Sequence, residues 1–179
     1  MNLFFLHINP AICAKWHCDK HVIKMLLELV QMLYTAHHLG ESVLPKDAYR
    51  KISNHNHPMC IWVRTNKLNY QFTCDLALCL AQEYTFRYNK VHSCEKHAFW
   101  LNENIPKFKE VIHKKETTLC YSPLMGELSP IPLTMPDQFK GTDPFKSYQA
   151  YYKTKKFARW KNTKSPIWFT LFDIKKYFI

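Results

Sequence analysis

Residues 22–33, VIKMLLELVQML, are apolar except at Lys24, Glu28 and Gln31. At 3.6 residues per turn these three side chains fall within about 40° of one line along a helix. Three further polar side chains extend the same line: His17, His21 and Thr35. A helix that is apolar on its other sides is surrounded by protein, so the polar line should face a cleft or a buried network with a function. The alternative is an ordinary exposed edge on which Lys24 and Glu28 pair one turn apart.

The rest of the chain predicts one compact all-α domain over residues 1–179, built around two long helices. Asn9-Pro10 favours a helix start, and Gly40 a helix end, for a first long helix over about 10–38. We expect a second long helix over 58–88, a shorter one over 93–102, and a basic one from Pro144 to about Trp160. Five prolines within 120–144 predict an ordered loop. The apolar residues 3–6 are either a strand-like arm or a tail packed into the core.

Composition narrows the class of protein. Only three glycines occur, with neither GxGxxG nor GxxxxGK[ST], which disfavours Rossmann and P-loop nucleotide enzymes. No apolar run reaches the ~18 residues of a membrane span, and residues 1–7 do not resemble a signal peptide. The seven cysteines are an odd number without a CxxC pair, which is typical of reduced thiols in a reducing compartment. We therefore expect an intracellular monomer that needs no cofactor and binds no membrane.

The charge is unevenly distributed along the chain. Lys and Arg number 25 against 14 Asp and Glu, a net charge of +11. Residues 140–164 contain eight basic residues and one acidic residue, Asp143, interleaved with aromatic side chains. Such a segment favours nucleic acid as the partner, with Lys153, Lys156 and Arg159 on the phosphates. The alternative is an amphipathic helix with its aromatic side chains in the core and its lysines in solvent.

Three blocks of the sequence resemble the pyrimidine-dimer DNA glycosylases of the phage endonuclease V type. They are CDKH at residues 18–21 followed by Glu28, NHP at residues 56–58 with Trp62 or Arg64 beyond it, and SPIWF at residues 165–169. Their order and approximate spacing match the family, which is all-α, basic and single-domain. The block NPxxCAxxHCDKH over residues 9–21 is also similar to uncharacterised phage and large-virus sequences, so cytoplasm or host nucleus is the expected location.

The resemblance implies a reaction and roles for individual residues. The family uses an N-terminal α-amine as nucleophile at the sugar C1′, here on Met1 or Asn2, with a glutamate, here Glu28, assisting proton transfers. The resulting imine also permits strand cleavage at abasic sites. In a different register Lys24 is the nucleophile, with a pKa lowered by burial, and His21 positions the sugar or a phosphate.

The same resemblance implies a damaged DNA duplex as substrate, with a nucleotide flipped out of the stack. Trp168 and Phe169 would contact the opened base pair. The remaining expected contacts to nucleic acid are His17, Asn56, His57 and Arg64.

Two other classes of function stay open. One is a non-catalytic nucleic-acid-binding protein in which the polar line is only structural. The other is a zinc-dependent nuclease or hydrolase, because Cys13, His17 and His21 recur every four residues, a spacing that suits zinc on a helix. The glutamate of an HExxH motif is absent from that stretch, so our first expectation is that the chain holds no metal.

Overall fold

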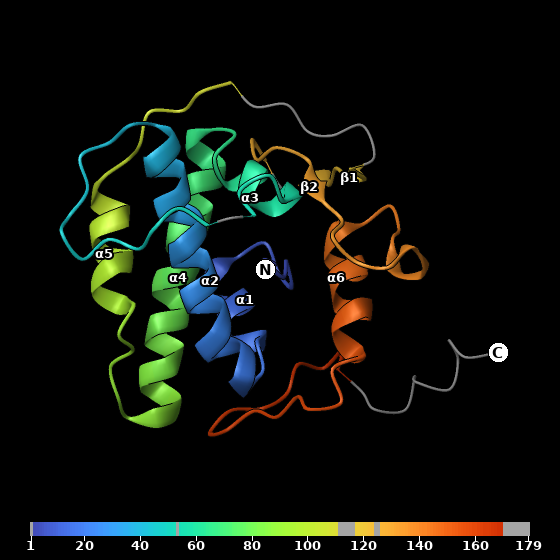
Figure 1. The fold of residues 1–179 in the computed structure, drawn as a ribbon. Coiled ribbons are helices and arrows are strands. Elements are labelled where there is room, and N and C mark those ends of the chain that lie inside the picture. The colour runs from blue at the N-terminus through green and yellow to red at the C-terminus, as the bar shows by residue number, and fades with distance from the viewer. Residues whose placement is uncertain (1, 53, 111–116, 124–125, 170–179) are drawn as a thin grey trace.

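The computed structural model describes residues 2–52, 54–110, 117–123 and 126–169 (Figure 1). Within these residues the fold is mostly α-helical, and the sheet is one pair of two-residue antiparallel strands. The helices are α1 (Pro10–Trp16), α2 (Asp19–Leu39), α3 (Pro58–Val63), α4 (Lys67–Tyr88), α5 (Glu95–Glu103) and α6 (Pro144–Lys153). The strands are β1 (Leu119–Cys120) and β2 (Ile131–Pro132), and η2 (Asp137–Phe139) is a 3-10 turn.

Helices α1, α2, α4 and α5 form one side of the molecule, and α6 stands on the other side (Figure 1). The amino-terminal segment lies between these two parts in the view of Figure 1. Helix α4 is the centre of the larger part, since it packs against α1, α2 and α5. No helix among the described residues is both long and apolar enough to cross a bilayer.

The first long helix is interrupted, which corrects the prediction of one helix over 10–38. Asn9 caps α1 as expected, since its side chain accepts from the backbone of Ala11 and Ile12. His17 then adopts an extended backbone, and α2 starts after Cys18. The break is stabilised by a tertiary contact, in which the backbone N–H of Cys18 donates to the hydroxyl of Tyr152 at 2.8 Å. The local sequence pattern could not predict this hydrogen bond, because Tyr152 lies 134 residues further along the chain than Cys18.

The second predicted helix, 58–88, is also two helices. Helix α3 ends at Val63, and Asn66 caps the start of α4 by accepting from the backbone N–H of Asn69 at 2.9 Å. The Asn69 side chain donates back to the carbonyl of Trp62 at 2.8 Å, which ties the two helices together across the turn. Pro58 opens α3 and Asn89, with φ 52°, ends α4.

The remaining predicted elements also differ from the structure at their ends. Helix α5 lies close to the expected 93–102, whereas α6 ends at Lys153 instead of near Trp160. The chain after α6 forms turns, such as the bond from the Ala158 N–H to the Lys155 carbonyl at 2.8 Å. The expected loop over 120–144 contains the short strands and η2 as well.

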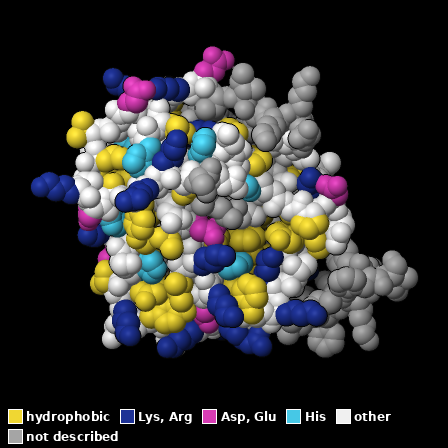
Figure 2. Space-filling view, viewed as in Figure 1, with side chains coloured by type: hydrophobic (Ala, Val, Ile, Leu, Met, Phe, Trp, Pro, Cys, Tyr) yellow, Lys and Arg dark blue, Asp and Glu magenta, His cyan; other side chains and the backbone are white. Residues whose placement is uncertain are grey.

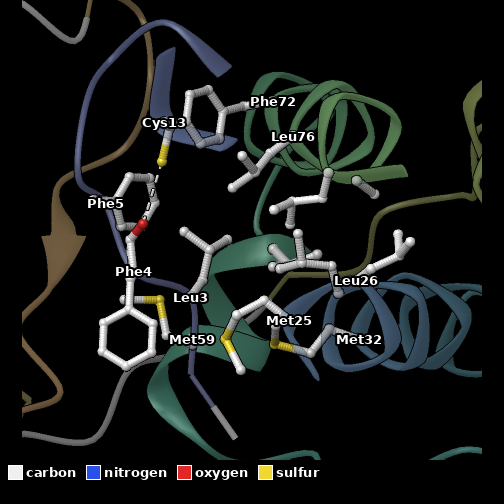
Figure 3. Packing of buried hydrophobic residues seen from close by; sticks show 14 of the residues in the cluster. Leu3, Phe4, Phe5, Cys13, Met25, Leu26, Met32, Met59, Phe72 and Leu76 are labelled. Carbon is white, nitrogen blue, oxygen red and sulfur yellow. Dashed lines mark hydrogen bonds between the residues drawn. The ribbon is translucent and has the colours of Figure 1, made fainter. Parts of the chain in front are cut away.

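The residues just after the amino terminus run through the core as a buried arm, residues 3–6, and are a tail packed into the core rather than a strand. Leu3, Phe4, Phe5 and Leu6 are all buried. Phe5 stacks on Phe72 of α4 with ring centroids 5.4 Å apart (Figure 3). The Cys13 thiol donates to the Phe4 carbonyl at 3.3 Å, shown as the dashed line in Figure 3. The arm therefore fixes Asn2, at its outer end, against the helices.

Candidate active site at the amino-terminal arm

The polar line on α2 is only partly buried. Glu28 is 8% exposed and His21 is 7% exposed, although both lie one or two turns from Lys24, whose side chain is 68% exposed. Lys24 and Glu28 form the ion pair expected of residues one turn apart, with Nζ 3.5 Å from Oε1. The ion pair of the alternative interpretation thus exists, but its carboxylate is buried, and a buried carboxylate needs further partners.

The second partner of Glu28 is the backbone nitrogen of Asn2, which donates to Glu28 Oε2 at 2.9 Å. This bond joins the first described residue of the chain to the middle of α2, 26 residues away. The structure thereby brings together two residues that the sequence assigned to one reaction, Asn2 and Glu28. Met1, the other candidate to carry the amine, lies outside the described residues.

Asn2 is held by a second contact that the sequence did not predict. Its side-chain oxygen accepts from the Thr134 hydroxyl at 2.6 Å, and its side-chain amide donates to the Thr134 carbonyl at 3.2 Å. The Thr134 hydroxyl also lies 3.1 Å from the hydroxyl of Tyr148 on α6, which donates to the Pro132 carbonyl at 2.6 Å. Thr134 therefore belongs to the site, and only the fold reveals it, because it stands in a proline-rich loop 132 residues from its partner.

Thr134, which contacts Asn2, also lines a cavity of about 480 Å³. Its lining includes side chains of mixed character: His57, Thr118, Thr134, Met135, Lys140 and Tyr151. His57 caps α3, accepting from the Met59 N–H at 3.2 Å, so its ring position is fixed. Burial lowers the pKa of His57, the charge of the amino terminus lowers it further, and Glu28 acts in the opposite direction. The cavity thus offers an imidazole and hydroxyl groups, and Thr134 links it to Asn2.

Contacts with core residues fix the position of the His21 side chain. Its Nδ1 bonds the Tyr152 hydroxyl at 2.8 Å, and its ring stacks on Phe4 with centroids 4.9 Å apart. Burial lowers the pKa of His21 to about 3, and His17, Lys155 and Lys24 add repulsion that lowers it too. The imidazole is therefore uncharged at neutral pH, so it offers a hydrogen bond and no positive charge.

His17, an expected contact to nucleic acid, is in the core. It is 1% exposed and its Nδ1 donates to the Cys13 carbonyl at 2.8 Å, which is not a surface position. The Cys13 thiol is also buried, and burial raises its pKa to about 11. Among the residues that the structure describes, no three His, Cys, Asp or Glu side chains are grouped to hold a metal ion. The zinc alternative with Cys13, His17 and His21 finds no support there.

Asn56 and Arg64 lie on the other side of the turn that carries His57. Both line a second cavity, of about 360 Å³, which Lys107 also borders. Asn56 is exposed, whereas Arg64 is 8% exposed and its Nη1 donates to the His55 carbonyl at 2.5 Å. Arg64 therefore supports the turn beneath His57, and only Asn56 presents its side chain openly to solvent.

The predicted basic and aromatic contacts follow α6. Lys153 is half-buried at the end of α6, and Lys156 and Arg159 are exposed in the turns beyond it. Trp168 is half-buried, with its ring centroid 5.6 Å from that of Trp16, and Phe169 contacts Trp160 at 4.6 Å. Figure 2 shows Lys and Arg side chains around hydrophobic patches on the lower part of one face.

No family model, no curated protein and no solved structure matches this chain.

Proposed function

We propose that this protein is a DNA glycosylase that removes a damaged base from duplex DNA, using an amine beside Glu28, and that it also cleaves the strand at abasic sites. One observation carries the proposal: the backbone nitrogen of Asn2 lies 2.9 Å from a buried carboxylate oxygen of Glu28. Removal of Met1 would convert this peptide nitrogen into an α-amine, and imine chemistry at a sugar requires such a nucleophilic nitrogen together with a group that moves its protons.

The nucleophile in this proposal is an α-amine. In a chain from which Met1 has been removed, the nitrogen of Asn2 is that amine, and in a chain that keeps Met1 the amine is one residue further out. An α-amine has a pKa of about 7.7–8.0, so a large part is unprotonated near neutral pH. Lys24 is the alternative nucleophile, and its side chain is 68% exposed and paired with Glu28.

The reaction forms one bond and breaks another at C1′. The amine lone pair attacks C1′ while the bond from C1′ to the base nitrogen breaks, and the base leaves with a proton. Glu28 takes a proton from the attacking nitrogen and gives it to O4′ as the sugar ring opens, which leaves the protonated imine. Loss of a C2′ proton to water and departure of the 3′-phosphate then cleave the strand, and water hydrolyses the imine to release the amine.

The surface charge supports DNA as the partner. The chain has a net charge of +11, and Lys156 and Arg159 are exposed beyond α6, so phosphates of the duplex have cations to bind. His57 lines the cavity that Thr134 borders, and the neighbouring Asn56 lines the second cavity, so this turn offers polar groups to a nucleotide flipped toward Asn2.

The test is borohydride trapping on ultraviolet-irradiated duplex DNA and on duplex DNA with an abasic site. We expect a covalent protein–DNA adduct with the unaltered protein, with or without a chelator. Glu28→Gln should lower the trapping rate by about 10²–10⁴-fold while DNA affinity is retained, because general acid–base assistance is lost. The matched control is Glu103→Gln, at the exposed end of α5, which should trap normally.

Peptide mapping of the adduct identifies the amine. We expect the DNA on Met1 or Asn2, and Lys24→Ala should still trap. An adduct on Lys24 would identify Lys24 as the nucleophile. Full activity of Glu28→Gln would contradict the proposal, and intact DNA binding with no adduct would leave a non-catalytic binding protein.

A further inference from the structure

A separate cavity of about 390 Å³ lies in the turns that follow α6. Three basic side chains line it, Lys155, Lys156 and Arg159, and among the described residues its lining includes neither Asp nor Glu. Two hydroxyl side chains, Thr163 and Ser165, complete its polar part. Cations together with hydroxyl donors, without a competing carboxylate, are the chemistry that binds a phosphate group.

The same cavity has an aromatic wall. Trp160 and Phe169 both line it, and their ring centroids lie 4.6 Å apart at 63°. The Trp160 indole donates to the Trp16 carbonyl at 3.2 Å, which anchors the ring to the end of α1. An aromatic wall next to a cationic pocket provides a surface on which a nucleobase can stack.

The cavity is held in place by a buried ion pair, which we call the Asp19 latch: Asp19 and Arg87 with their bonds to the loop. Asp19 donates its backbone N–H to the Arg159 carbonyl at 2.8 Å, and its carboxylate accepts from the Lys161 N–H at 2.9 Å. Arg87, whose side chain is fully buried, pairs with that carboxylate at 2.9 Å. The cavity walls are therefore fixed before any ligand arrives, which reduces the entropy that binding must overcome.

Lys155 contacts a residue of the cavity that Thr134 lines. Its ammonium lies 3.9 Å from the ring centroid of Tyr151, and Tyr151 lines that cavity. The two cavities are therefore bordered by side chains that touch each other.

We infer that the cavity after α6 binds one further nucleotide of the DNA strand, with its phosphate on Lys155, Lys156 and Arg159 and its base against Trp160 and Phe169. The volume is within the range of about 300–1,000 Å³ that small-ligand sites occupy. The inference rests on the proposed function only in taking DNA as the ligand, and it does not depend on the chemistry at Glu28.

The first test measures how the affinity for a short single-stranded oligonucleotide depends on salt. The variant Lys156→Ala with Arg159→Ala should bind more weakly, and the slope of log K against log salt should fall by about 0.7 for each phosphate that the variant no longer binds. The control removes the same charge elsewhere, at the exposed Lys90 and Lys146. Equal reductions of affinity and slope in the two variants would overturn the inference, because net charge alone would then explain binding.

The second test separates a nucleotide from a bare phosphate. Phe169→Leu and Trp160→Leu should each weaken oligonucleotide binding by about 5- to 150-fold with an unchanged salt slope, since the stacking surface is removed and the charge is kept. Phe99→Leu, on the exposed face of α5, is the control. The inference fails if Phe169→Leu folds and binds the oligonucleotide as tightly as the unaltered protein. It also fails if inorganic phosphate competes with the oligonucleotide as well as dTMP does, because the base would then not contact the aromatic wall.

Trapping distinguishes this inference from the proposed function. The unaltered protein and the control variant with Lys90→Ala and Lys146→Ala should both form the covalent adduct with abasic DNA. Loss of trapping in every protein, with the salt and stacking effects intact, would reject the glycosylase and keep the nucleotide site.

Discussion

At the scale of single residues, the buried histidines make stability depend on pH. Burial lowers the pKa of His17 to about 4, of His21 to about 3 and of His37 to about 4, against 6.5 in an unfolded chain. Below pH 6.5 the unfolded chain takes up protons that the native protein does not. The stability contributed by these neutral rings is therefore full above pH 6.5 and falls as the pH drops toward 4.

We expect the free energy of unfolding in urea to fall between pH 7 and pH 5, by up to about 1.4 kcal/mol per pH unit for each histidine. The variant His17→Asn keeps a donor for the Cys13 carbonyl and removes one titrating group, so its pH dependence should be shallower by about a third. A free energy of unfolding that stays constant over this pH range would show that the rings are protonated in the native protein.

Residue patterns singled out Glu28 of the candidate site, and the resemblance implied Asn2, but neither predicted the residues that hold them. Glu28 follows from the sequence because one carboxylate in an apolar helix has few structural reasons to be there. Thr134 and Tyr148 could not be predicted from the sequence, since the bond of Thr134 to Asn2 and its contact with Tyr148 depend on tertiary packing. Lys24 was expected to be buried and is exposed, because the polar line turns from core to solvent within one helical turn.

At the scale of elements, the Asp19 latch holds the basic loop to α2 and α4. Asp19→Ala removes the acceptor for the Lys161 N–H and one of the two carboxylates that pair with Arg87, which keeps Glu83 at 2.7 Å and the Lys15 carbonyl at 3.0 Å. Breaking a buried ion pair by removing one partner typically costs about 3–5 kcal/mol. We expect trypsin to cleave within residues 155–164 several times faster in this variant than in the unaltered protein.

The control for the latch is Asp47→Ala, which removes an exposed carboxylate that pairs with Lys96. Exposed ion pairs contribute little, so the cleavage rate in the basic loop should stay unchanged. Equal protection of the loop in Asp19→Ala and in the unaltered protein would mean that aromatic packing alone holds it.

The sequence predicted the presence of the helices better than the residues at which they end. The helix starts predicted at Asn9-Pro10 and at His57-Pro58 are confirmed, since α1 and α3 begin there. The break after His17 was missed because a hydroxyl from α6 stabilises it. The early end of α6 was missed because the basic aromatic pattern continues past Lys153 into turns.

At the scale of the whole molecule, the buried arm joins the large helical part to α6. Phe5 is fully buried and contacts Trp62 and Phe72 on one side and Tyr148 of α6 on the other. Phe5→Ala should lower the free energy of unfolding by about 3–5 kcal/mol, with one cooperative transition because both parts share this ring. Urea unfolding followed by fluorescence and by circular dichroism measures both quantities.

The matched control for the arm is Phe86→Ala, whose ring is 62% exposed on α4. Its free energy of unfolding should change by no more than about 0.5 kcal/mol. Two separate transitions in Phe5→Ala, or a decrease as small as that of the control, would show that the arm is not central to the fold.

The position of Asn2 also sets an order of events during synthesis. Asn2 is made before any other described residue, yet Thr134 and Tyr148, which hold its surroundings, are made long after it. Until those residues leave the ribosome, the side chain of Asn2 lacks both its hydroxyl partner and its carbonyl partner on Thr134. The contacts of Asn2 are therefore among the last to form in a chain that is made from its amino terminus.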